Sequence, residues 1–117
     1  MEFVDTHTHL DGPEFDADRD AVVCRAREAG VSRVFVPATD LKSVDSVLDV
    51  CDRYPGYAWP MIGLHPEEVR GDWREVLTEM RRMASPRFIA IGEVGLDYYW
   101  SREFEHEQLE AFEEQVR

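Results

Sequence analysis

Short apolar runs alternate along the chain with longer segments in which apolar residues recur every three or four positions. The short runs are rich in β-branched and aromatic residues, which predicts strands over Phe3–Asp5, Arg33–Ala38 and Tyr57–Gly63 and a fourth within 87–96. A helical pattern follows each of them, and this order indicates parallel βαβ units rather than a β-sandwich. We therefore expect an α/β fold with parallel strands and outer helices.

The helices are delimited by capping residues and by proline. Four are expected: Asp16–Ala29, from the N-cap Asp40 to before Pro55, from the N-cap Asp72 to before Pro86, and from the cap Ser101 to the end of the chain. Glu75 stands three residues after Asp72, which approximates a capping box. Gly30 is expected to end the first helix, since glycine adopts positive φ without strain.

Two strands carry further expectations. Pro60 lies in the middle of the third strand and cannot donate a backbone hydrogen bond, so we expect an irregular ladder there. The fourth run, "RFIAIGEVGL", is apolar at both alternating sets of positions, which predicts a strand covered on both faces.

The unit count sets the fold class. Four βα units are half of the eight that form a TIM-type barrel, and the sequence stops within the fourth helix without a closing turn. We expect a (β/α)4 half of a (β/α)8 barrel, with residues 1–117 as the N-terminal half of one domain.

The segment "DTHTHLD" holds two of the four histidines of the chain. Side chains two positions apart on an extended segment point to the same side, so His7 and His9 are able to bind one metal ion. Two imidazoles suit Zn²⁺, Mn²⁺ or Fe²⁺, and Asp5 or Asp11 is expected to orient the rings. A polar loop that follows a strand is the alternative interpretation.

Polar residues stand just after each predicted strand, namely His9, Asp40, His65 and Glu93. Active sites of β/α barrels lie at this end of the strands, which makes Glu93 a candidate metal ligand and catalytic residue. A capping or salt-bridged carboxylate is its alternative. His65 suits phosphate binding or acid/base catalysis, or else an exposed turn, whereas Asp40 is interpreted as a helix cap.

Composition narrows the class of partner. The formal net charge of −12 opposes broad contact with nucleic-acid phosphates, so a phosphate substrate would need a local cation. Cys24 and Cys51 make no metal-binding spacing and favour a reduced, cytoplasmic protein with both thiols in the core, although one disulfide stays open. No apolar run is long enough to span a membrane. Tyr98, Tyr99 and Trp100 follow Glu93 and either pack internally or line a pocket and stack on a base.

Three ordered motifs resemble those of the TatD family of metal-dependent deoxyribonucleases: "VDTHTHLD", "GLHPEE" and "IAIGEVGLDYYW". The resemblance runs along the whole chain and implies a (β/α)8 barrel of the amidohydrolase type. It also implies that His7, His9 and Glu93 bind metal, that Glu93 bridges two ions, and that His65 lies near the substrate phosphate. The family takes two more histidines and an aspartate from a second half that this sequence does not contain.

The resemblance implies a function and its cofactors. It implies hydrolysis of DNA phosphodiesters by a water activated by two divalent ions, Mg²⁺, Mn²⁺ or Zn²⁺. The acidity of the chain weakens binding to long duplexes, which favours ends or single strands as the substrate. A metal-dependent amide or ester hydrolase is an alternative, because the two-histidine strand is shared among amidohydrolase barrels. A non-catalytic half-barrel that needs its missing half or self-associates is another, because it would expose strand edges.

Overall fold

The computed structural model describes residues 1–117. The elements follow in the order β1 (Phe3–Asp5), η1 (Pro13–Phe15), α1 (Arg19–Glu28), β2 (Val31–Pro37), α2 (Leu41–Arg53), β3 (Ala58–Ile62), η2 (Pro66–Glu68), α3 (Trp73–Met83), β4 (Ala90–Ile91) and α4 (Glu105–Val116).

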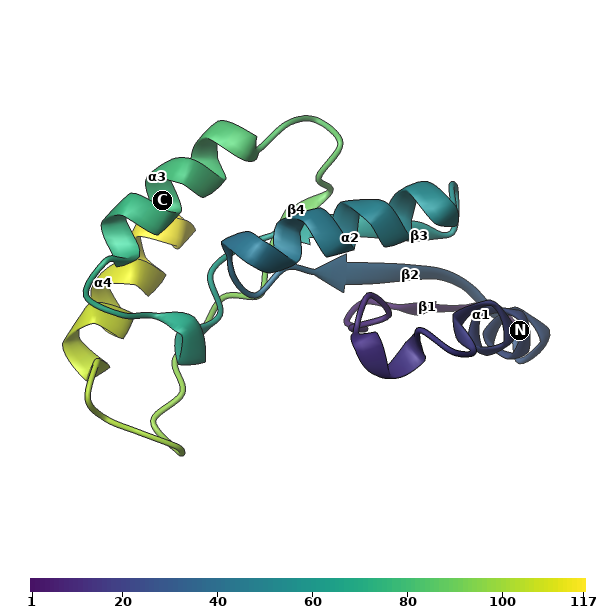
Figure 1. Ribbon diagram of the computed structural model, residues 1–117, viewed down its shortest axis with the longest axis horizontal. Coiled ribbons are helices and arrows are strands. Elements are labelled where there is room, and N and C mark those ends of the chain that lie inside the picture. The colour runs from purple at the N-terminus through teal and green to yellow at the C-terminus, as the bar shows by residue number, and fades with distance from the viewer.

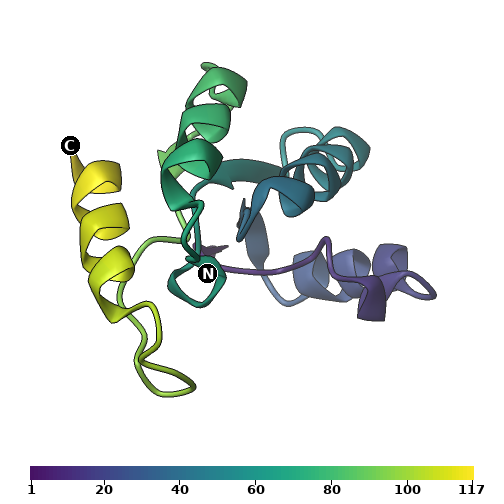
Figure 2. The same cartoon turned by 60° about the vertical axis from the view of Figure 1, so that its left-hand side comes forward.

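The strands form one parallel sheet in the order β1-β2-β3-β4. Each neighbour in the sheet is the next strand in the sequence, and a helix connects each pair. Figure 2 shows the helices as an arc around one side of the strands, while Figure 1 shows α3 and α4 together at the end of the molecule remote from α1. The predicted (β/α)4 arrangement with outer helices is confirmed.

The core lies between the middle of the sheet and α2. Val36 of β2 and Val44 and Val47 of α2 are completely buried. These residues follow from the predicted apolar stripe of the helix and from a strand with neighbours on both sides. The middle strands are therefore the best-covered part of the sheet.

The two outer strands are exposed. All three residues of β1 are exposed, and so are both residues of β4, including Ile91 with 58% of its surface accessible. The expectation that the fourth strand is covered on both faces is wrong for this chain. The reason is that β4 is the sheet edge and pairs only with β3, for two residues.

Pro60 does not disturb the ladder between β2 and β3, whose register is continuous from Val34 opposite Ala58 to Pro37 opposite Met61. The predicted irregularity is wrong. The Pro60 carbonyl accepts a hydrogen bond from the Ile89 amide, so its backbone polar groups face β4. The missing donor therefore falls at the short edge strand, where proline is tolerated.

The helix starts are only partly as predicted. The Asp40 side chain accepts a hydrogen bond from the Ser43 amide, and the Ser43 hydroxyl accepts one from the Asp40 amide, which confirms this cap. Asp72 caps α3 without a side-chain hydrogen bond, so the predicted capping box is wrong. The Ser101 hydroxyl instead accepts the Glu103 amide in a local turn, and α4 begins only at Glu105.

The segment before α1 is ordered by a buried arginine. Only 8% of the Arg19 surface is accessible, and its guanidinium donates to the carbonyls of Leu10 and Gly12 and to the Asp16 carboxylate. These bonds stabilise a turn where the sequence predicts helix, so α1 starts at Arg19 rather than at Asp16. Gly30 follows the helix with a φ of 95°, as expected.

The structure bears on the expectations for the cysteines and for a membrane span. Both cysteines are free thiols; Cys51 is buried as expected, but Cys24 is exposed, so its assignment to the core is wrong. Cys24 is an exposed residue of α1. None of the helices has the length and hydrophobicity that a membrane span requires.

Candidate metal centre

His7 and His9 lie in the extended segment directly after β1. The Thr8 amide between them donates to the Phe35 carbonyl of β2 at 3.0 Å, so the segment continues alongside the sheet. The two imidazoles therefore point to the same side, with their ring centroids 5.1 Å apart and their planes at 80°. The predicted same-face geometry is confirmed.

The end of β2 also holds the other two site segments. The His65 amide donates to the Thr39 carbonyl at 2.8 Å, and the Glu93 amide donates to the Ala38 carbonyl at 3.1 Å. Together with the Thr8 bond, backbone carbonyls between residues 35 and 39 anchor three loops that are distant in sequence. The sequence gives no sign of this role, because backbone carbonyls are present at every position.

A glycine permits the close approach of the Glu93 segment. A Cβ atom at Gly63 would lie 2.7 Å from the carbonyl carbon of Gly92, closer than real Cβ atoms come, and a tight 3.1 Å from the Glu93 nitrogen. Gly63 follows β3, two positions before His65. Gly63 is a positional requirement of the site, and the "IGLH" context is its only signal in the sequence.

Three ligand atoms converge on one point. His7 Nε2 is 3.3 Å from His9 Nε2, and the Glu93 Oε2 atom is 3.0 Å from the former and 3.4 Å from the latter. Atoms bound at about 2.1 Å to one ion, with bond angles near 90° to 110°, are separated by about 3.0 to 3.4 Å. The three distances fit this spacing.

The donor set and its exposure are also suitable for a metal. Two imidazole nitrogens and one carboxylate oxygen are the ligands of several transition-metal sites. His7 and His9 keep about half of their side-chain surface accessible, at 49% and 46%, so an ion can reach them from solvent. The residues of this chain therefore fit a divalent transition metal.

His65 contacts the other oxygen of the same carboxylate. Its Nε2 atom lies 3.0 Å from Glu93 Oε1, while its Nδ1 atom accepts the Glu67 amide at 3.0 Å. An imidazole nitrogen that accepts an amide hydrogen has no proton of its own, so in the neutral ring the proton resides on Nε2. His65 thus donates to Glu93 and fixes the orientation of its carboxylate.

Other expected contributors lie elsewhere. Asp5 accepts the backbone amide of His7, and Asp11 accepts the Ser46 hydroxyl, so neither orients an imidazole ring as predicted. Asp5 fixes the backbone that presents the ring, whereas Asp11 links the first loop to α2. Asp40 serves as the α2 cap and takes no part in the centre.

Comparisons with known proteins identify the family of the chain. The model of the family "TatD related DNase" matches residues 4–117. The chain belongs to this family. A "3'-5' ssDNA/RNA exonuclease TatD" from Erwinia tasmaniensis is 36% identical over 110 residues, which cover 92% of this chain and 41% of that protein. The "Uncharacterized metal-dependent hydrolase YjjV" of Escherichia coli K12 is 37% identical over 111 residues, with 91% and 42% covered.

Solved structures of TatD proteins share the fold. The crystal structure of E. coli YjjV superposes with a TM-score of 0.81 and 32% identity, over 97% of this chain and 45% of that one. A TatD family hydrolase from Entamoeba histolytica gives a TM-score of 0.75 at 22% identity, which supports the fold only. The four strands and their helices match half of the TatD TIM barrel, and the chain spans less than half the length of these relatives.

Proposed function

We propose that residues 1–117 form the N-terminal half of one barrel domain that hydrolyses nucleic-acid phosphodiesters with divalent metal ions. The observation that carries the proposal is the convergence of His7, His9 and Glu93 at distances suited to ligands of one ion. Membership of the TatD-related DNase family supports it. DNA ends or single strands are the proposed substrate.

The residues have distinct roles in this proposal. His7, His9 and Glu93 would hold the metal, and Glu93 would bridge two ions, Mg²⁺, Mn²⁺ or Zn²⁺. Ions bound there would supply a water with a lowered pKa and would neutralise charge on the phosphate. His65 holds the Glu93 carboxylate through its Nε2–H. We propose that during catalysis the same N–H donates instead to an oxygen of the substrate phosphate.

The charge of the chain supports a small, local phosphate site. Thirteen lysines and arginines against 25 acidic residues give the chain no broad basic surface for duplex binding. Bound cations would supply positive charge only where the phosphodiester is cleaved. This distribution favours short contacts with a strand end over contacts along a duplex.

The exposed edge strands β1 and β4 favour pairing of the sheet with additional strands. Phe3 and Val4 of β1 and Ile91 of β4 present apolar surface at the two edges. Edges of this kind pair with further strands, either those of the missing half or those of a second copy. We propose that catalysis requires this completion, because the ligands present here form only part of a two-metal site.

A metal-dependent amide or ester hydrolase is the second candidate. The donor set of two histidines and one glutamate does not distinguish a phosphoryl from an acyl substrate. The chain has one lysine, Lys42 in the first turn of α2, and it makes no hydrogen bond or salt bridge with Glu93. This placement disfavours a carbamate-bridged site and leaves the nuclease as the better candidate.

The decisive experiment joins this chain to the portion of E. coli YjjV that lies beyond the matched region. The purified chimera, with Mg²⁺ or Mn²⁺, is incubated with an end-labelled single-stranded oligodeoxynucleotide, and the products are separated by length. We expect stepwise shortening. Glu93→Gln keeps the side-chain shape and removes the charge, and we expect it to lower the rate at least about 100-fold.

Three results would contradict the proposal. Equal cleavage by the Glu93→Gln chimera would show that the nuclease activity does not use this centre. Intact DNA together with turnover of an acyl ester or amide panel would establish the second candidate. A folded, metal-loaded chimera without activity on either class would favour a non-catalytic half-barrel.

A further inference from the structure

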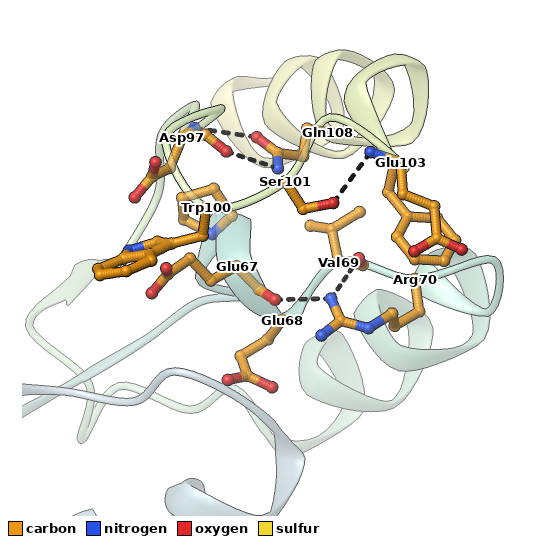
Figure 3. A pocket seen from close by; sticks show the side chains of 11 residues that line it. Glu67, Glu68, Val69, Arg70, Asp97, Trp100, Ser101, Glu103 and Gln108 are labelled. Atoms are coloured by element: carbon orange, nitrogen blue, oxygen red, sulfur yellow. Dashed lines mark hydrogen bonds between the residues drawn. The ribbon is translucent and has the colours of Figure 1, made fainter.

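A cavity of about 390 Å³ lies between η2 and the loop that leads from Glu93 to α4. Its volume falls within the roughly 300 to 1,000 Å³ typical of small-molecule sites. Figure 3 shows Trp100 and Arg70 at opposite sides of it. None of the proposed metal ligands lines this cavity, so it is separate from the metal centre.

The cavity nevertheless adjoins the centre. Glu67, one of its lining residues, donates its amide to His65 Nδ1 at 3.0 Å, and His65 Nε2 contacts Glu93. One imidazole ring and two hydrogen bonds therefore separate the cavity wall from the metal-facing carboxylate. The cavity wall and the proposed metal ligand Glu93 therefore share His65 as a common neighbour.

The charges of the lining exclude phosphate. Four carboxylates line the cavity against one guanidinium: Glu67, Glu68, Asp97 and Glu103 against Arg70. The Arg70 Nη1 atom is already committed to the carbonyl oxygens of Glu67 and Val69, at 2.6 and 2.8 Å. Carboxylates repel phosphate but accept hydrogen bonds from the amino groups of nucleobases.

The loop that carries Trp100 is held in place by Gln108 of α4. The Gln108 side chain, of which 5% is accessible, accepts the Asp97 amide and donates to the Asp97 carbonyl, both at 2.9 Å. Asp97 in turn accepts the Tyr99 amide at 3.0 Å. Preorganised loops of this kind reduce the entropy lost on binding.

Trp100 offers an aromatic surface at the mouth of the cavity. The side chain is 74% accessible, and its one aromatic neighbour, Tyr99, meets it edge-on with centroids 4.7 Å apart. An edge contact leaves a broad face of the indole free. Exposed tryptophans of this kind stack on bases irrespective of sequence.

We propose that this cavity binds one nucleobase of the strand held at the metal centre, with Trp100 stacking on the base and the carboxylates accepting its amino hydrogens. This inference rests on the nucleic-acid substrate of the proposed function. Of the three aromatic residues expected to stack on a base, Tyr98, Tyr99 and Trp100, only Trp100 lines the cavity. The proposal also predicts that bases with an amino group bind more tightly than thymine.

The first test measures binding without metal, so that it does not depend on nuclease activity. The 117-residue chain in EDTA is titrated with deoxycytidine monophosphate, and the indole N–H resonances of its three tryptophans are followed by NMR. The Trp100 resonance is assigned as the one that is missing in the Trp100→Phe variant. We expect deoxycytidine monophosphate to shift this resonance. Deoxyribose 5-phosphate, which lacks the base, should not shift it. Equal shifts with both probes, or none with either, would overturn the proposal.

The second test uses the chimera. An abasic residue placed at each of the last three positions of a single-stranded substrate should raise KM by roughly five- to tenfold at one position. The measured quantity is the ratio of KM for the abasic substrate to KM for the intact substrate. Trp100→Ala should reduce this ratio to about one, while Trp100→Phe should largely restore it. Tyr99→Ala removes an equally exposed ring outside the cavity and should keep most of the ratio. An unchanged ratio in Trp100→Ala would overturn the proposal even if the chimera cleaves DNA.

Discussion

Strands β1 and β2 are neighbours in the sheet and serve the site in opposite ways. β1 is exposed along its length and leads directly into the two histidines. β2 contains buried residues such as Val36 and contributes no candidate ligand, yet the carbonyls at its end anchor three site loops. The comparison separates the residues that do the chemistry from those that fix where it happens.

The division has a physical reason. A ligand needs access to solvent or to an ion, whereas an anchor needs a backbone that does not move. The middle of the sheet, paired on both sides and covered by α2, meets the second requirement, and the edges meet the first. The largest expected effects of mutation on stability therefore lie in β2, which carries no ligand, rather than at the ligands themselves.

A charge placed in each region tests this difference most strongly. Val36→Asp buries an unpaired carboxylate at a completely inaccessible position and should destabilise the fold by at least about 4 kcal/mol, enough to unfold the isolated chain. Ile91→Asp places the same group on the exposed edge strand and should change stability by less than about 1 kcal/mol. Circular dichroism during urea unfolding measures both. A folded Val36→Asp variant would contradict the assignment of β2 as the anchor.

The two thiols extend the contrast to reactivity. Burial raises the pKa of the Cys51 thiol from 9.0 to about 12, whereas Cys24 is exposed on α1. Because the thiolate is the reactive form, iodoacetamide at pH 8 should modify Cys24 at least about 100-fold faster than Cys51. Mass spectrometry of timed samples identifies the alkylated residue. Comparable rates would mean that the α2 side of the core opens readily.

The same pKa shift gives the sign of a pH effect. The folded state keeps the Cys51 proton at a pH where the unfolded state, ionising near 9.0, has lost it. This contribution to stability is complete below pH 9 and declines as the pH rises from 9 towards 12. Urea midpoints should therefore fall faster above pH 9 in the wild type than in Cys51→Ala.

Helix caps give the smallest expected effect. Asp40→Ala removes the capping box of α2 and should cost about 1 kcal/mol. Asp72→Ala is the matched control, because Asp72 caps α3 without a side-chain hydrogen bond, and it should cost less than about 0.5 kcal/mol. Denaturant unfolding of the two variants compares them. Equal losses would show that the side-chain hydrogen bonds of the Asp40 capping box add nothing to stability.

The sequence predicted what depends on local pattern. Strand order, the Asp40 cap and the positions of His7, His9, His65 and Glu93 after strand ends follow from apolar periodicity and from polar residues that interrupt it. The starts of α1 and α4 differ from the prediction, because the Arg19 bonds to the preceding loop and the local Ser101 turn compete with helix propensity.

Two further features of the site depend on long-range backbone contacts and could not be predicted from the sequence. The anchoring of His65 and Glu93 to carbonyls of residues 38 and 39 has no side-chain signature. The need for Gly63 appears only when the Gly92–Glu93 peptide is placed against it. Such contacts are recognised only in the folded structure, although the residues that they position can be predicted from the sequence.

A Co²⁺ titration of the 117-residue chain, followed by the visible absorption of the bound ion, tests the central claim most directly. We predict one bound equivalent, because the chain has one cluster of three ligands, and its loss in the His7→Ala, His9→Ala, Glu93→Ala triple variant. His106→Ala, which removes an exposed histidine on α4, should bind like the wild type. Unchanged binding by the triple variant would contradict the assignment of these residues as the metal centre.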